Sequence, residues 1–279
     1  MEGKAMASDL HTHTNFSDGS FSPEELVTAA KNIGLHYLGI TDHDTVDGVR
    51  HLYENGLYPG RGVNIIPGVE LSANHPERDI HIVGYNIDIY NEALLEMIDK
   101  IIEARWERFS EIISILQDKK YNIREADVLK IAGTSRSIGR AHIARTLVKF
   151  GAFRTVRDAF DKMLGKGKPA YVPRYLPEVD EVIDVIHQAG GLAVLAHPKL
   201  VGDDELVENL CKKVDGLEVY YPFHKPAEVQ HYFFLAKEHN LLITGGSDFH
   251  GTSSRYVNKL GEFTISDKLA EKFFVEPQN

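Results

Sequence analysis

At the start of the chain, a segment whose apolar residues have helical spacing lies between short apolar segments typical of strands. The segment SPEELVTAAKNIG has apolar residues at helical spacing. Ser22 is a suitable N-cap, Pro23 occupies the first helical position, and Gly34 is suited to end the helix. On both sides of this helix, β-branched apolar runs predict strands at MASDL, 36–41, 64–71 and 79–87. Strands and helices therefore alternate in this part of the chain.

The pattern changes between Asn91 and Phe160, where only helical periodicity occurs. Roughly 70 residues of helix without a strand are typical of an insertion, and we expect a helical subdomain at 91–169. After the linker 165–177, strands and helices alternate again. The strands LAVLA and LLITG are apolar throughout, which predicts a parallel sheet or barrel. Residues 1–90 and 170–279 would together form this α/β barrel domain.

Composition narrows the possible functions. The single cysteine, Cys211, excludes an internal disulfide framework and a cysteine-based zinc cluster, and fits a reducing cytoplasm. No apolar run approaches the roughly 20 residues that span a bilayer, so we expect no membrane association. The net charge of −10 argues against binding of duplex DNA, which needs a basic face. Small phosphorylated substrates remain compatible, because bound cations would reverse the charge locally.

Histidines and carboxylates follow nearly every predicted strand. Active sites of parallel α/β folds lie at the carboxyl ends of their strands. Residues two apart in a strand share one face, so His11 and His13 can bind one ion together. Imidazole and carboxylate are ligands of zinc, manganese and iron. The nine candidate metal ligands are His11, His13, Asp18, His43, Glu70, His81, His197, Asp248 and His250.

Six motifs along the chain resemble those of the polymerase-and-histidinol-phosphatase (PHP) superfamily. They are DLHTHTNFSDGSFSPEEL, GITDHDTVDGV, IPGVELS, IHIVGYNID, LAHP and GSDFHG, in that order. The helical insertion with GRAHIARTLV and GKGKPAYVP, followed by GLEVYYP, is similar to the stand-alone TrpH-like branch, whose members are phosphoesterases acting on nucleotides.

The resemblance implies a distorted (β/α)7 barrel, TIM-like and of PHP type, that holds three divalent metal ions. It assigns the first ion to His11, His13, Glu70 and Asp248. It assigns the second to Glu70, His81 and His197, and the third to Asp18, His43 and His250. The metals are expected to be Mn²⁺, Fe²⁺ or Zn²⁺.

The ligand set predicts hydrolysis of a phosphomonoester. Six neutral histidines and three carboxylates would leave three divalent ions with a surplus of about +3, which favours a phosphate group. A metal-activated hydroxide would be the nucleophile, and no serine or cysteine nucleophile is needed. We expect His43, Asp248 and His250 to be catalytic, with the proton donor for the leaving group unassigned among His43, His250 and a water molecule.

Other residues are candidates for contacts with the substrate. Arg140 and His142 lie on a predicted insertion helix that could overhang the site, and Lys168 lies in the glycine-rich linker. Glu218, at a strand end, could line the pocket or orient a ligand. We expect these four residues to bind the substrate.

The predicted enzyme is a phosphoric monoester hydrolase acting on a nucleotide, such as a 3′,5′-bisphosphonucleotide or an AMP-like monophosphate. Alternatives are a 5′-3′ exoribonuclease on short oligoribonucleotides and a histidinol-phosphate phosphatase. An amidohydrolase is a further alternative, although such barrels need a bridging lysine where this chain has Glu70. The last alternative is a metal- or nucleotide-binding module without catalysis.

Overall fold

The structure is a computed structural model that describes all residues except 1–6, 59–61, 77, 79, 252–258 and 275–279. Strands and helices alternate as predicted up to residue 73, and the next strand then follows with no helix between them among the described residues. These elements are β1 (Ala7–Asp9), α1 (Pro23–Ile33), β2 (Leu35–Ile40), α2 (Asp47–Glu54), β3 (Asn64–Ala73) and β4 (Ile80–Tyr85).

The middle of the chain contains helices, and strands return after it. The helical elements are α3 (Glu92–Asp118), α4 (Glu125–Ala132), α5 (Arg140–Lys149), α6 (Val156–Ala159) and the π-turn η1 (Phe160–Leu164). There follow α7 (Val179–Gln188), β5 (Leu192–Leu195), α8 (Pro198–Val201), α9 (Asp204–Cys211), β6 (Gly216–Tyr220), α10 (Pro226–Glu238), β7 (Leu242–Gly245), β8 (Ile265–Ser266), α11 (Asp267–Ala270) and η2 (Glu271–Phe273).

The strands form one sheet in the order β7-β6-β5-β4-β3-β2-β1-β8. The two ends of the sheet meet, because the amide of Leu10 donates to the carbonyl of Gly245 at 3.2 Å and Thr12 forms a parallel bridge with Phe249. The sheet is therefore a nearly closed barrel, and the predicted α/β barrel with inserted helices is confirmed.

The strands LAVLA and LLITG pair in parallel with β6 as predicted, but two other strands of the barrel run antiparallel to their neighbours. β4 is antiparallel to both β3 and β5, and β8 is antiparallel to β1. Only residues 74–79 connect β3 to β4. A parallel crossover needs about a dozen residues or more, so this short connection returns the chain in the opposite direction.

The first helix shows why its boundaries were predictable. The Ser22 hydroxyl accepts a hydrogen bond from the Glu25 amide at 3.2 Å, and the Glu25 carboxylate accepts one from the Ser22 amide at 2.8 Å. This capping box satisfies two amides that would otherwise lack partners at the helix start. Gly34 ends α1 with a positive φ of 81°, a conformation that glycine adopts without steric cost.

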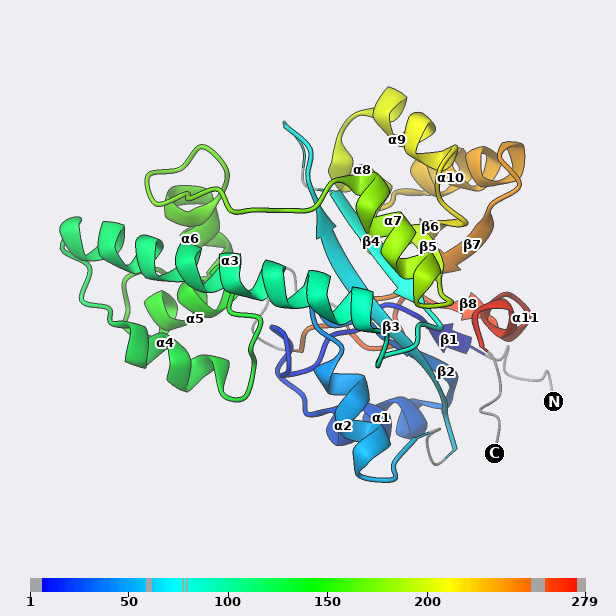
Figure 1. Ribbon diagram of the computed structural model, residues 1–279, viewed down its shortest axis with the longest axis horizontal. Helices are drawn as coiled ribbons and strands as arrows, with labels where there is room; N and C mark the ends of the chain where they lie inside the picture. Colours follow the sequence, from blue (N-terminus) through cyan, green and yellow to red (C-terminus); the bar gives the residue numbers. More distant parts are fainter. Residues whose placement is uncertain (1–6, 59–61, 77, 79, 252–258, 275–279) are drawn as a thin grey trace.

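The 27-residue helix α3 runs from beside the sheet to the other helices of the insertion (Figure 1) and takes part in two hydrophobic cores. Near its start, Leu94 and Ile98 pack into the core between the sheet and its covering helices. Further along, Phe109 and Ile113 pack against α4, α5 and α6 in a separate core. Because one helix serves both cores, the domain limits at residues 91 and 169 stay a prediction.

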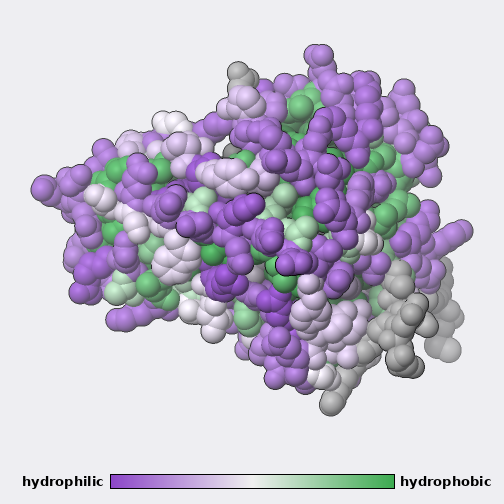
Figure 2. Space-filling model, viewed as in Figure 1, coloured by the Kyte–Doolittle hydropathy of each residue, from purple (hydrophilic) through white to green (hydrophobic). Residues whose placement is uncertain are grey.

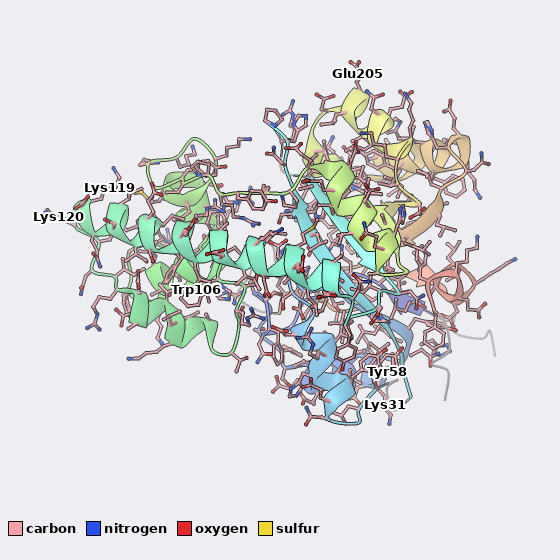
Figure 3. All side chains as sticks on the ribbon, viewed as in Figure 1. Lys31, Tyr58, Trp106, Lys119, Lys120 and Glu205 are labelled. Atoms are coloured by element: carbon pink, nitrogen blue, oxygen red, sulfur yellow. The ribbon has the colours of Figure 1, made fainter. Side chains whose placement is uncertain are left out.

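The outer surface is mainly polar in the view of Figure 2, with apolar residues exposed in small patches. Trp106 projects from the middle of α3, whereas Lys119 and Lys120 lie at its far end, away from the barrel (Figure 3). None of the helices that the structure describes combines the length and the apolar character needed to cross a bilayer.

Candidate metal centre

The predicted metal ligands meet at one end of the barrel. His11 and His13 follow β1, and His43 follows β2. His81 lies at the beginning of β4, opposite Ser72 near the end of β3. Because β4 is antiparallel to its neighbours, its first residues lie where the parallel strands end. The reversed strand therefore adds a ligand to the same site.

Glu70 of β3 is the centre of this cluster and is completely buried. Its two carboxylate oxygens face five histidine rings, all within 3.4 Å. Oε1 lies 2.7 Å from His81 Nδ1 and 2.8 Å from His197 Nε2; Oε2 lies 2.9 Å from His43 Nδ1, 3.3 Å from His11 Nε2 and 3.4 Å from His13 Nε2.

Two aspartates complete the cluster. Asp18 Oδ1 lies 3.1 Å from His250 Nε2 and 3.9 Å from His43 Nε2. Asp248 Oδ1 lies 3.1 Å from His13 Nε2. The structure thus brings all nine predicted ligands together. Three overlapping groups have ligand atoms within 4.8 Å of one another: His13, Asp18, His43 and His250; His11, His13 and Glu70; and His43, Glu70 and His81.

Burial and charge set the protonation of these groups. Burial opposes ionisation of Glu70, but His43, His81 and His11 outweigh it and hold the pKa of Glu70 well below its usual value. Burial also opposes protonation of His43, yet the carboxylates of Glu70 and Asp18 raise its pKa to about 9. Burial and repulsion by His250 and His43 lower the pKa of His13 to about 3. Protonated forms of neighbouring histidines in this cluster therefore repel one another.

The donor set fits divalent metal ions. Several of its buried atoms lack a well-aligned hydrogen-bond partner among the described residues, including His11 Nε2, His43 Nδ1, Glu70 Oε2 and Asp18 Oδ1. Buried polar atoms normally have partners, so unsatisfied atoms that converge in one place indicate a missing ligand. Imidazole nitrogens and carboxylate oxygens are the ligands that Zn²⁺, Mn²⁺ and Fe²⁺ share.

Glu218 contacts two of the predicted metal ligands, His11 and His197. It is 1% exposed and does not line the cavity, so its position fits the alternative of orienting a ligand better than the predicted contact with the substrate. Its Oε1 lies 3.0 Å from His11 Nδ1, and its Oε2 accepts a hydrogen bond from the His197 amide at 2.7 Å. Carboxylates in this position fix the orientation of a ligating histidine. Tyr221 acts similarly, since its hydroxyl donates to Asp248 Oδ2 at 3.0 Å.

Helix α5 holds the loop that carries Asp18. The guanidinium of Arg145 donates to the Asp18 carbonyl. His142 bonds the backbone of Ser17, and its Nδ1 accepts from the Gly139 amide at 3.1 Å. Burial lowers the pKa of His142 to about 4, so this ring is neutral. The predicted substrate contact His142 therefore lies behind the loop and does not line the cavity.

A cavity of about 710 Å³ adjoins the cluster and extends beneath the helical insertion. Arg140 lines it, as predicted for a substrate contact. Lys168 is exposed outside it, and Lys166 lines the cavity in its place. Sequence reasoning missed four further arginines in the lining, Arg78, Arg105, Arg108 and Arg174. The one available signal was the spacing of Arg105 and Arg108, which places them on one side of a helix.

Comparison with known proteins identifies the family. The model of the PHP domain matches residues 9–191. The chain belongs to the PHP family. A crystal structure from Bifidobacterium adolescentis, described as a metal-dependent phosphoesterase, superposes with a TM-score of 0.87 at 33% identity and covers 98% of this chain and 96% of that one. The resemblance to the PHP superfamily that the motifs indicated is therefore confirmed.

Two curated PHP relatives have different names. A protein of Salmonella typhimurium named 5′-3′ exoribonuclease Rnm is 37% identical over 255 residues, which are 88% of this chain and 86% of the relative. A 3′,5′-nucleoside bisphosphate phosphatase of Chromobacterium violaceum is 31% identical over 251 residues, 87% of this chain and 86% of the relative. This PHP protein is thus a metal-dependent hydrolase of phosphoesters, as the motifs predicted.

Proposed function

We propose that the protein hydrolyses phosphomonoesters of nucleotides, with a 3′,5′-bisphosphonucleotide as the preferred substrate. One observation carries this proposal. Members of the ligand cluster and several arginines line the same cavity, so a molecule with two anionic groups fits its charge. The name of the Chromobacterium violaceum relative supports the same substrate.

We propose three divalent ions, Mn²⁺, Fe²⁺ or Zn²⁺, as cofactors. When bound, they would polarise the phosphoryl oxygens and lower the pKa of a water molecule. Nine residues would hold them: His11, His13, Glu70 and Asp248; Glu70, His81 and His197; and Asp18, His43 and His250. The completely buried His11, His13 and Glu70 form the floor of this site.

The exposed edge of the cluster faces the substrate. The side chains of His43 and His81 are 19% and 24% exposed, and those of Asp248 and His250 are 14% and 11% exposed. We assign the protonation of the leaving oxygen to a water molecule at this edge, because His43 and His250, which line the cavity there, would hold an ion through their neutral rings. Asp248, fixed by Tyr221, would hold an ion together with His13. A proton donor within reach of the leaving oxygen contributes about 10²- to 10⁴-fold to a rate.

A second candidate function is 5′-3′ cleavage of short oligoribonucleotides. The observation that favours it is the identity of 36–37% to proteins named as such exoribonucleases, which exceeds the 31% identity to the bisphosphate phosphatase. The two reactions differ in the bond that breaks, since a phosphodiester has a nucleoside on both sides of its phosphate.

Phosphate release and product analysis test the proposal. The Mn²⁺-loaded protein is incubated with a 3′,5′-bisphosphonucleotide, a nucleoside monophosphate and a 5′-phosphorylated RNA of a few nucleotides. We expect inorganic phosphate from the bisphosphonucleotide with the highest kcat/KM. Mononucleotides released from the RNA at a higher kcat/KM would favour the second candidate, and no release from any substrate would refute both.

A further inference from the structure

Four arginines from three segments of the chain meet beside the metal centre. Arg105 and Arg108 lie on α3, Arg140 begins α5, and Arg174 lies in the linker before α7. All four line the same cavity as the metal ligands. Four positive charges in one place need an explanation, because like charges in a partly buried site repel one another strongly.

The described residues around the cluster supply little neutralising charge. Asp44 is completely buried and accepts hydrogen bonds from Arg105 Nε at 2.8 Å and from Arg174 Nη2 at 2.9 Å. Arg140 donates to the uncharged carbonyl of Leu164 at 3.2 Å. The acidic residues in the described part of the cavity lining are Asp18 and Asp248, and both belong to the metal centre. Arg105 and Arg174 thus share one carboxylate and Arg108 has none among the described residues, so these three guanidinium groups carry a formal excess of two positive charges.

Donor atoms of this cluster are buried without partners. Arg174 Nη1 and Arg108 Nε have no hydrogen-bond partner in the described structure, and the side chain of Arg174 is 6% exposed. Burial, together with the charges of Arg140, Arg174 and Arg105, lowers the pKa of Arg108 to about 8. Both effects disfavour the charged form unless an anion is present. Buried guanidinium groups normally pair with an acid, so this cluster has the properties of an anion-binding site.

Tyr171 positions the cluster. Its ring lies 5.5 Å from the guanidinium carbon of Arg108 and 5.6 Å from that of Arg140. These cation–π contacts hold two guanidinium groups in fixed directions. Planar guanidinium forks bind the oxygens of a phosphate in pairs, and several of them match a dianion better than a single carboxylate.

We propose that Arg105, Arg108, Arg140 and Arg174, here called the arginine site, bind a second phosphoryl group of the substrate that is not cleaved. This inference rests on the proposed function, since it takes the metal centre as the place of hydrolysis. The arginine site then selects substrates with two phosphoryl groups, because a monophosphate leaves its excess charge unneutralised. Arg108 has no carboxylate partner in the described structure and is the residue whose change tests the site most cleanly.

The test compares two substrates that differ by one phosphate. The kcat/KM of the metal-loaded protein is measured for a nucleoside 3′,5′-bisphosphate and for the matching nucleoside 3′-monophosphate. We expect the natural protein to favour the bisphosphate by about 10- to 100-fold, the range of hydrogen bonds to a charged group. Arg108→Ala should remove most of this preference through a higher KM for the bisphosphate, and Arg108→Lys should retain part of it.

Turnover of the monophosphate is the internal control for folding. It should change by less than about threefold in Arg108→Ala, because the monophosphate lacks the second phosphoryl group that Arg108 would contact. Arg157→Ala is the matched control, since Arg157 is 71% exposed and paired with Asp161. If Arg108→Ala loses turnover of both substrates, Arg108→Lys is compared with the natural protein instead. A preserved rate with the monophosphate together with a weaker preference for the bisphosphate then supports the arginine site.

Two outcomes separate this inference from the proposed function. Equal kcat/KM values for the two substrates, unchanged in the Arg108 variants, would overturn the arginine site and the preference for a bisphosphate, while hydrolysis of phosphomonoesters stands. No release from either substrate by the metal-loaded protein would overturn the phosphatase, and the arginine site as a substrate site with it.

Discussion

Glu70 Oε2 lies 2.9 Å from Nδ1 of His43, and the backbones beside them are joined as well. The Glu70 carbonyl accepts a hydrogen bond from the Asp44 amide at 2.9 Å, and the Glu70 amide donates to the Asp42 carbonyl at 3.2 Å. The end of β2 and the middle of β3 therefore fix these two side chains relative to each other. This pairing places a carboxylate at the centre of the histidine cluster.

Replacing that carboxylate should remove metal. Glu70→Gln keeps the shape of the side chain but loses the charge that five histidine rings face. We expect fewer bound metal ions per chain and a fall in phosphate release of more than about 100-fold, beyond the usual effect of a supporting residue. Elemental analysis measures the metal. Glu205→Gln is the control, because Glu205 is exposed at the outer edge of α9 (Figure 3). Normal metal content in Glu70→Gln would contradict the assignment.

Glu218 should influence metal affinity and leave substrate affinity alone. Glu218→Gln retains a side chain that can accept from the His197 amide but removes the negative charge beside His11 Nδ1. We expect metal affinity to fall by about 10- to 100-fold, as for other carboxylates behind a ligating histidine. Competition with a chelator measures it. Unchanged metal affinity with a raised KM would instead identify Glu218 as the substrate contact that the sequence suggested.

Arg145 should matter through the loop that it holds. Arg145→Ala removes the hydrogen bond to the Asp18 carbonyl, and Asp18 should then be less well placed beside His43 and His250. We expect the loss of about one metal ion per chain while the other ligands keep theirs. Arg154→Ala, an exposed change in the same helical region, is the control. Full metal content in Arg145→Ala, measured by elemental analysis, would show that the loop needs no such support.

Metal binding should release protons at neutral pH. The carboxylates of Glu70 and Asp18 outweigh burial and raise the pKa of His43 to about 9 in the metal-free protein, so this ring is protonated at pH 7. An incoming ion must displace that proton, and its affinity should fall as the pH falls, by up to about tenfold per pH unit for each proton. Calorimetry in two buffers with different ionisation enthalpies counts the protons. Identical apparent enthalpies would contradict this prediction.

Local sequence signals predicted the elements that carry the site. The cap at Ser22, the glycine at Gly34 and the apolar strand runs each act over a few residues, and the structure has these elements close to the predicted bounds. The ligands could be found because each follows or interrupts such a run. The direction of β4 was missed, since apolar content does not encode strand direction; the short connection from Ala73 to Ile80 was the available signal.

Apart from Arg140, the arginine site could not be predicted from the sequence because it depends on packing. Arg105 and Arg174 are 69 positions apart, and only the docking of α3 and the linker against Asp44 brings them together. An arginine on a helix is usually solvated, so its residue type alone gave no reason to expect burial. Lys166 and Lys168 illustrate the same limit, since the linker conformation alone decides which of them lines the cavity.

Phosphate release before and after removal of metal tests the central claim most directly. The protein is freed of metal with a chelator, dialysed and assayed with a 3′,5′-bisphosphonucleotide, first without metal and then with one, two and three equivalents of Mn²⁺. The account predicts no release without metal and a rate that rises until the cluster around Glu70 is filled. Undiminished release from the metal-free protein would contradict it.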